Sequence, residues 1–199
     1  MTKKIFYLCE TPDMKLSILI PSLTTRYESR TALLSSLSTQ YKGDDVEVLT
    51  QVDRGYMSIG HKRNLLLDRA KGDYLCFADD DDELVSNYIS LIMEGIDKGV
   101  DCCSLLGVYT TNGTNPELFE HSIKHKEWID GTPTQGIRYF RPPNHLNCIK
   151  SDIAKKFRFE EINHGEDRLW SDAIQRSGLL KTEHMITDIL YHYKFKTVK

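Results

Sequence analysis

Residues 74–84 read YLCFADDDDEL, so an apolar run typical of a buried strand ends in four consecutive aspartates. If the strand continues through them, Asp79 and Asp81 project from one face and Asp80 from the other, because side chains alternate along an extended chain. Burying like charges without compensation is costly, so such a cluster either faces water or binds a cation. Oxygen ligands favour Mg²⁺ or Mn²⁺. By itself, the run is more typical of an acidic loop or of the start of a helix from Leu84, because acidic runs are common.

Strands and helices alternate around this stretch. Strands are predicted over 15–22, 46–52 and 74–78, and helices over 30–40, 58–70 and 84–96. Further on, the patterns predict a strand over 100–109, a hairpin or loop over 110–117, helices over 150–157 and after 163, and a strand over 186–193. Ser151 or Asp152 is expected to cap the helix over 150–157. This alternation indicates an α/β fold with a mostly parallel central sheet flanked by helices.

Polar side chains follow each of the first three strands, where ligands bind in such sheets. The first strand ends at Pro21 and Ser22, with Thr24 and Arg26 close behind, and the second ends at Asp53. The third ends in the aspartate run. We therefore expect a ligand site where these strand ends meet.

The helix predicted from Ser58 opens with a basic stretch, 60–64, that contains Lys62, Arg63 and Asn64. Free backbone N–H groups and basic side chains at a helix start can receive a phosphate. The alternative is that Lys62 and Arg63 form a solvated helix face.

Composition narrows the class of protein. The chain has 199 residues, a net charge of −3 and 40% hydrophobic residues, as expected for one globular domain over 1–199 without general affinity for nucleic acid or anionic membranes. No apolar run approaches the length of a membrane span, and Glu10 and Asp13 interrupt the N-terminal apolar patch, which is predicted to be a lead-in strand. The five cysteines lack metal-site spacing, so we expect reduced, buried thiols and a cytoplasmic protein.

Two later segments add candidate site residues. Residues 121–158 hold eight Lys or Arg, three acidic residues and Trp128, a mixture suited to a polyanion or a sugar, or simply a basic loop. After Asn163, His164 and Gly165 come Glu166 and Asp167, which either complement a helix dipole or form a second pair of acids facing the first. His192 lies between two tyrosines, where a histidine is more often packed than a ligand.

With these pieces in order, residues 16–193 resemble the family 2 glycosyltransferases of the GT-A fold, a Rossmann-like domain. The resemblance rests on strand ends at Ser22 and Asp53, the helix start 62–64, the segment 72–82 and the Gly-Glu-Asp sequence 165–167. Ala78 departs from the pattern, since the family often has a bulkier residue there. The resemblance implies an inverting enzyme that uses a nucleotide sugar, here a UDP-sugar, with Mn²⁺ or Mg²⁺.

The resemblance also implies roles for individual residues. Asp167 would be the catalytic base, and Asp81 and His192 the metal ligands. Glu166, Trp128 and His164 would lie on the acceptor side, in a half covering about 111–199. The donor would bind in the half covering about 15–110, to Pro21, Ser22, Thr24, Arg26, Asp53, Lys62, Arg63, Asn64, Asp79 and Asp80.

Three hypotheses for function stay open at this point, and a glycosyltransferase is the first. A nucleotidyltransferase also needs paired acids, Mg²⁺ and a basic phosphate site, although no Gly-rich loop follows the first strand. A non-catalytic nucleotide-sugar-binding module is the third possibility. The acceptor is equally open: a glycan, a lipid-linked sugar, a protein, a small molecule or a hydroxylated DNA base.

Overall fold

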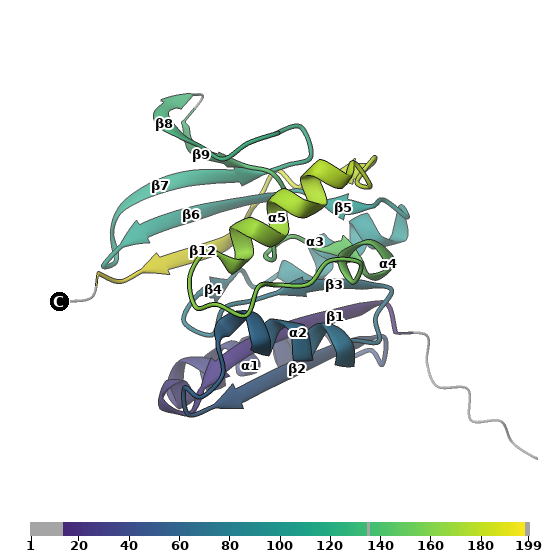
Figure 1. The fold of residues 1–199 in the computed structure, drawn as a ribbon, viewed down its shortest axis with the longest axis vertical. Coiled ribbons are helices and arrows are strands. Elements are labelled where there is room, and N and C mark those ends of the chain that lie inside the picture. The colour runs from purple at the N-terminus through teal and green to yellow at the C-terminus, as the bar shows by residue number, and fades with distance from the viewer. Residues whose placement is uncertain (1–13, 135, 198–199) are drawn as a thin grey trace, which may run out of the picture.

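The structure is a computed structural model that describes residues 14–134 and 136–197. Two six-stranded sheets and five α-helices make up this part of the chain (Figure 1). The lead-in strand predicted for the N-terminus falls in residues 1–13 and lies outside the described residues.

The first sheet has the strand order β2-β1-β3-β10-β5-β11 when read from its β2 edge. Strands β1, β2 and β3 run parallel, as predicted, and β10 runs antiparallel to both β3 and β5. The bounds are β1 (Leu16–Leu23), β2 (Val46–Asp53), β3 (Tyr74–Phe77), β5 (Cys102–Cys103), β10 (Ile149–Lys150) and β11 (Glu183–His184). The predicted parallel core is therefore confirmed, with short strands added at one side.

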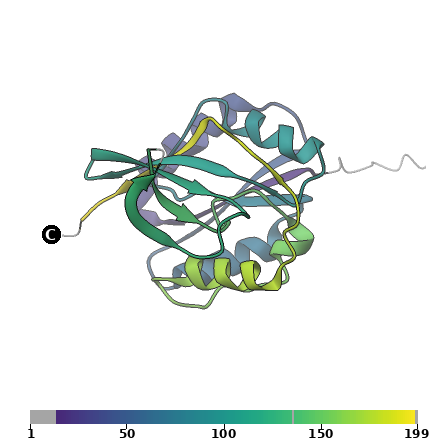
Figure 2. The ribbon, with the colours of Figure 1, turned by 90° about the horizontal axis from the view of Figure 1, so that it is seen from above.

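Helices cover both faces of this sheet (Figure 2). One layer contains α1 (Tyr27–Gln40), which follows a 3₁₀ turn at Thr24–Arg26, and α3 (Tyr88–Asp97). The other contains α2 (Ile59–Arg69), α4 (Ser151–Ala154) and α5 (Glu166–Ser177). The helix predicted from residue 84 begins at Tyr88, because Glu83–Leu84 form strand β4.

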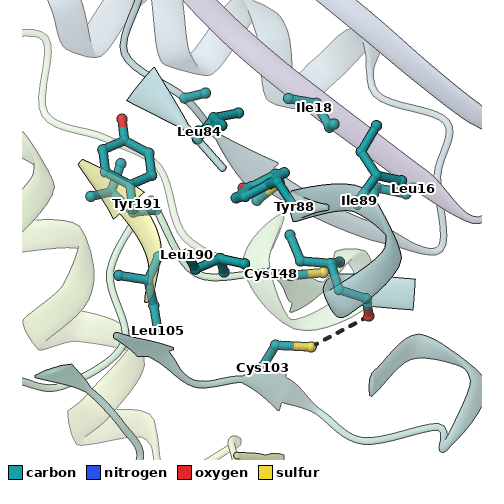
Figure 3. Packing of buried hydrophobic residues seen from close by; sticks show 14 of the residues in the cluster. Leu16, Ile18, Leu84, Tyr88, Ile89, Cys103, Leu105, Cys148, Leu190 and Tyr191 are labelled. Atoms are coloured by element: carbon teal, nitrogen blue, oxygen red, sulfur yellow. Dashed lines mark hydrogen bonds between the residues drawn. The ribbon is translucent and has the colours of Figure 1, made fainter. Parts of the chain in front are cut away.

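Two hydrophobic clusters hold these layers on the sheet. Alternate residues of β1 point to opposite faces, so Ile18 packs toward α1 and α3 while Leu19 packs toward α2 and α5. Figure 3 shows the first cluster, in which Tyr88 and Ile89 of α3 lie against Leu16 and Cys148. Four of the five cysteines are free and buried, as predicted, whereas Cys9 lies outside the described residues.

The second sheet was not predicted as a separate unit. Its order is β4-β12-β6-β7-β9-β8, and it lies above the first sheet in Figure 1. Its bounds are β4 (Glu83–Leu84), β6 (Leu105–Thr111), β7 (Thr114–His121), β8 (Ile129–Thr134), β9 (Ile137–Arg141) and β12 (Ile189–Phe195). The strand predicted over 100–109 is wrong as one element, because the chain leaves the first sheet after Cys103 and enters the second at Leu105.

Two other local predictions have clear outcomes. Of the hairpin or loop predicted over 110–117, the hairpin is confirmed, since β6 and β7 pair antiparallel across Asn112 and Gly113, both with positive φ. The helix predicted over 150–157 is only α4, and neither proposed cap operates there, because the hydroxyl of Ser151 donates to the carbonyl of Gly72 instead. No helix among residues 14–134 and 136–197 is long and apolar enough to cross a membrane.

Candidate active site

The carboxyl ends of β1, β2 and β3 meet at one edge of the first sheet, as predicted. Ser22 at the end of β1 donates a hydrogen bond to Asp80, which follows β3. Arg26 donates to the other oxygen of Asp80 at 2.7 Å and lies 3.2 Å from Asp81. The structure therefore brings Ser22, Arg26, Asp80 and Asp81 into one polar cluster.

The aspartate run does not continue β3. The strand ends at Phe77, and the N–H of Asp82 donates to the carbonyl of Asp79, which closes a turn. The alternation expected if the strand continued is therefore absent, and the alternative of an acidic loop is confirmed. Each aspartate instead has its own surroundings.

Those surroundings leave Asp81 as the carboxylate of the run that is partly exposed and paired only with an exposed side chain, that of Arg26. Asp80 is buried against Ser22 and Arg26, and Asp82 accepts hydrogen bonds from the Tyr191 hydroxyl and the N–H of Lys194. The side chain of Asp81 is 31% exposed, and its ion-pair partner Arg26 is itself 44% exposed. Burial raises the pKa of Asp81, and the neighbouring aspartates add to that shift, although Arg26 opposes it.

Burial also raises the pKa of Asp82, to about 8, with the charge of Asp79 as the second cause. Its two hydrogen bonds tie the turn to β12 of the second sheet. The same Tyr191 hydroxyl accepts a hydrogen bond from the N–H of Asp79. Tyr191 therefore fixes both ends of the acidic turn, so Asp82 serves the fold rather than a ligand.

Asp53 and Lys62 form a buried pair at the end of β2. The ammonium of Lys62 lies 2.9 Å from Asp53 and 3.0 Å from the carbonyl of Ser22, while Asp53 also accepts from the N–H groups of Gly55 and Met57. Burial alone would raise the pKa of Asp53, but these hydrogen bonds lower it below its usual range. Lys62 therefore ties β1 to β2 and is not a free phosphate ligand.

The start of α2 is likewise committed to the fold, contrary to the predicted phosphate site. The N–H groups of Ile59, Gly60 and His61 donate to Asn163, Ile162 and Ser58, respectively. Asn64 bonds through its side-chain amide to both the carbonyl and the N–H of Phe159. Lys62 and Asn64 therefore both have structural contacts in this fold, and their donor roles stay predictions.

Arg63 lies at the centre of the buried part of the site. Its guanidinium contacts Asp79 at 3.1 Å and Glu166 at 3.4 Å, and it lies over the rings of Phe77 and Phe159. Burial alone would raise the pKa of Asp79, but Arg63 and then His145 lower it well below its usual range. Glu166 is therefore buried and faces Arg63.

Asp167 differs from Glu166 because the two occupy neighbouring positions of a helix. Gly165 has φ of 83° and starts α5, whose inner face carries Glu166 and, four residues on, the buried Trp170. Asp167 points away from that face, is 30% exposed and lines an open cavity of about 420 Å³. Of the two acids, only Asp167 is available to a ligand in this cavity.

His145 lies between the two acidic groups and was missed by the sequence analysis. Its Nε2 is 3.5 Å from Asp79 and its Nδ1 is 3.8 Å from Asp167. The buried segment 142–148 holds it, in part through Asn147, which bonds to the N–H of Asn144. A single histidine between Asn144 and Leu146 gives no periodic pattern in the sequence. Only the fold shows that it lies between Asp79 and Asp167.

The remaining predicted residues are scattered. Trp128 lines the same cavity as Asp167, which agrees with an acceptor-side position, whereas His164 is exposed in the loop before α5.

His192, the other predicted metal ligand, stands opposite Glu83 in the β12–β4 pairing. Because side chains alternate, it faces the other side of the sheet from Tyr191, so this placement does not support it as a partner of Asp81. Pro21 is buried in β1, and Thr24 is exposed in the 3₁₀ turn.

Comparison with solved structures shows the fold. S. aureus TarS aligns with a TM-score of 0.62 at 15% identity, covering 91% of this chain and 37% of that chain. TarS 1-349 in complex with UDP-GlcNAc aligns with a TM-score of 0.61 at 16% identity, covering 94% and 60%. The chain thus spans 37% to 60% of these TarS chains, which is less than two thirds. A197 from STIV gives a TM-score of 0.50 at 15% identity, covering 87% and 82%.

Comparison of sequences identifies the family. A search of curated proteins finds no match. The family described as glycosyl transferase family 2 matches residues 30–162, which include the acidic turn, Arg63 and His145. Together with the GT-A fold of the TarS structures, this match confirms the predicted fold class and resemblance. The chain belongs to glycosyl transferase family 2.

Proposed function

We propose that this glycosyltransferase moves a sugar from a UDP-sugar to an acceptor hydroxyl, with inversion at the anomeric carbon and with help from Mn²⁺ or Mg²⁺. The observation that carries the proposal is the placement of Asp79 and Asp167 on opposite sides of His145. One acid belongs to the turn at the sheet edge and the other lines a cavity. Structures of TarS 1-349 with UDP and with UDP-GlcNAc support the choice of donor.

The metal requirement rests on the donor set at the sheet edge. Among residues 14–134 and 136–197, no group of three or more His, Cys, Asp or Glu is arranged to hold a metal ion. Mg²⁺ in nucleotide sites commonly uses one or two carboxylates, with phosphates and water supplying the rest. Asp81 fits that role once Arg26 turns aside, and a metal bound there would stabilise charge on the leaving diphosphate.

The transfer step then uses Asp167 as the base. Its carboxylate accepts the proton of the acceptor hydroxyl while that oxygen forms a bond to the anomeric carbon. The bond from this carbon to the diphosphate oxygen breaks, and its electron pair leaves with UDP. Attack from the side opposite UDP inverts the configuration, and the products are the glycosylated acceptor, UDP and one proton.

Arg63 supports this step without touching the reacting atoms. Its guanidinium contacts both Asp79 and Glu166, so a buried positive charge lies between the two acids. Asp167 remains as the carboxylate that can take a proton from a bound hydroxyl.

The test is incubation with a panel of nucleotide sugars that includes UDP-GlcNAc, with and without Mn²⁺. Release of UDP that depends on Mn²⁺ is the expected result. Pyrophosphate would instead indicate a nucleotidyltransferase, and binding without turnover would indicate a binding module. Product configuration, read by NMR, tests inversion.

A matched pair of variants tests the metal ligand. Asp81→Asn removes a charge from the proposed site, so we expect it to lose the Mn²⁺-dependent part of UDP affinity in calorimetric titration. Asp97→Asn changes an exposed aspartate at the far end of α3 and should bind UDP as the wild type does. Equal Mn²⁺ dependence in Asp81→Asn would contradict the assignment of Asp81.

A further inference from the structure

The cavity beside Asp167 has the composition of a sugar-binding pocket. Five aromatic residues line it, four from strands of the second sheet and Trp128 from the loop before β8: Tyr109, Phe119, Trp128, Tyr139 and Tyr193. Its volume of about 420 Å³ lies in the ordinary range for small-ligand pockets. From this cavity we infer that the acceptor is a carbohydrate whose terminal sugar ring binds among these residues. This inference rests on the proposed function.

Unpaired polar atoms in the cavity point to a ligand rich in hydroxyl groups. In the part of the chain that the structure describes, Trp128 Nε1 and His145 Nδ1 are buried and have no hydrogen-bond partner. His145 is only 5% exposed. Buried polar atoms are normally paired, so a bound group is expected to satisfy them. A sugar hydroxyl can both donate and accept, and so can pair with either atom.

The aromatic residues provide the apolar part of the pocket. Tyr109 stacks on Tyr193 with ring centres 5.4 Å apart, and Tyr139 packs against Tyr109 at the same separation. The Tyr139 hydroxyl is held by Glu117, which fixes that ring. Rigid rings of this kind suit a ligand with one apolar face and polar edges, which describes a pyranose ring.

The charges of the cavity favour a neutral ligand over nucleic acid. Its lining holds two carboxylates, Asp130 and Asp167, and a single guanidinium, Arg141, that is already paired with Asp130. Two of the basic residues considered for a polyanion are paired with acids elsewhere, Lys124 with Glu120 and Arg138 with Glu117, and Lys126 donates to the carbonyl of Ile123. A nucleic-acid site would instead present unpaired cations.

The test uses saturation-transfer NMR with UDP, Mn²⁺ and an equimolar mixture of methyl glycosides of glucose, galactose, N-acetylglucosamine and ribose. We expect transfer to the ring protons of at least one glycoside in the wild type. Trp128→Phe keeps a ring but removes the N–H donor, and should weaken that glycoside about two- to tenfold. Trp128→Ala should lose it. Met185→Ala, at an exposed position outside the cavity, should behave as the wild type does.

Two controls separate this inference from the proposed function. UDP signals in every variant show that the fold and donor site are intact. UDP binding without any glycoside signal, or glycoside binding that Trp128→Ala leaves unchanged, would overturn the sugar pocket but leave sugar transfer standing. Binding of a 12-base-pair DNA duplex in place of glycosides would also overturn it. Absence of UDP binding in the wild type would count against the proposed function itself.

Discussion

Replacing the buried Arg63 with methionine should lower the free energy of unfolding more than the same replacement of an arginine in a surface ion pair. Arg63 is 4% exposed and is shared by two acids, Asp79 and Glu166, whose side chains are 21% and 6% exposed. Methionine fills similar space between Phe77 and Phe159 but leaves both carboxylates without their cation. Removing one partner of a buried ion pair costs about 3–5 kcal/mol.

The measurement is urea unfolding followed by circular dichroism, with Arg158→Met as the control. Arg158 pairs with Asp68 on the surface, where the two side chains are 50% and 58% exposed, so its loss should cost less than about 1 kcal/mol. For a chain of this size, the loss at Arg63 corresponds to a fall in Tm of roughly 6–20 °C. Adding Glu166→Gln to Arg63→Met should recover part of the loss, because it removes one unpaired charge.

Equal destabilisation in Arg63→Met and Arg158→Met would refute this reasoning. So would a double variant no more stable than Arg63→Met alone, since the cost would then come from packing and not from unpaired acids.

Two further predictions concern the folded state. Gly60→Ala should lower the thermal midpoint strongly, because a Cβ at this position would lie 1.8 Å from the carbonyl oxygen of Glu160. Gly131→Ala is the control and should leave the midpoint unchanged, because a Cβ there would meet nothing within 4 Å. Equal midpoints in the two variants would contradict the close approach of Gly60 to Glu160. Burial lowers the pKa of His121 to about 3, although the hydrogen bond that His121 donates to Asn147 opposes this shift. The contribution of His121 to stability is therefore complete above its unfolded pKa of about 6.5 and is lost as the pH falls toward 3. His121→Gln should flatten the fall in urea midpoint between pH 6.5 and 4, and an unchanged slope would contradict this prediction.

The sequence was sufficient for the features that depend on local patterns. Apolar runs and helical spacing predicted β1, β2 and β3 with their helices, and the carboxyl-end rule placed Ser22, Asp53 and the aspartate run together. It also separated Asp167 as the candidate base, although both Asp167 and Glu166 stayed open until the helix phase of α5 was known.

The failures have a common physical cause. Which groups a polar side chain bonds to depends on contacts between distant segments, and local sequence does not report them. The sequence does not show that Lys62 lies 2.9 Å from Asp53, or that Asn64 bonds to the backbone of Phe159. The second sheet was missed for the same reason, because its strand β6 is continuous in sequence with β5 and separates only where Ser104 leaves the first sheet.

The most direct test of Asp167 as the catalytic base uses the Asp167→Asn variant. Two quantities are measured for it and for the wild type: the rate of UDP release from a UDP-sugar in the presence of acceptor, and the affinity for UDP. Asparagine keeps the size of the side chain but cannot take the proton from the attacking hydroxyl, so the rate should fall by about 10²–10⁴ with UDP affinity unchanged. Glu166→Gln, at the neighbouring inward position, should retain far more activity. A near-wild-type rate in Asp167→Asn would contradict the assignment of Asp167 as the base, and a loss of UDP affinity would move Asp167 from catalysis to donor binding.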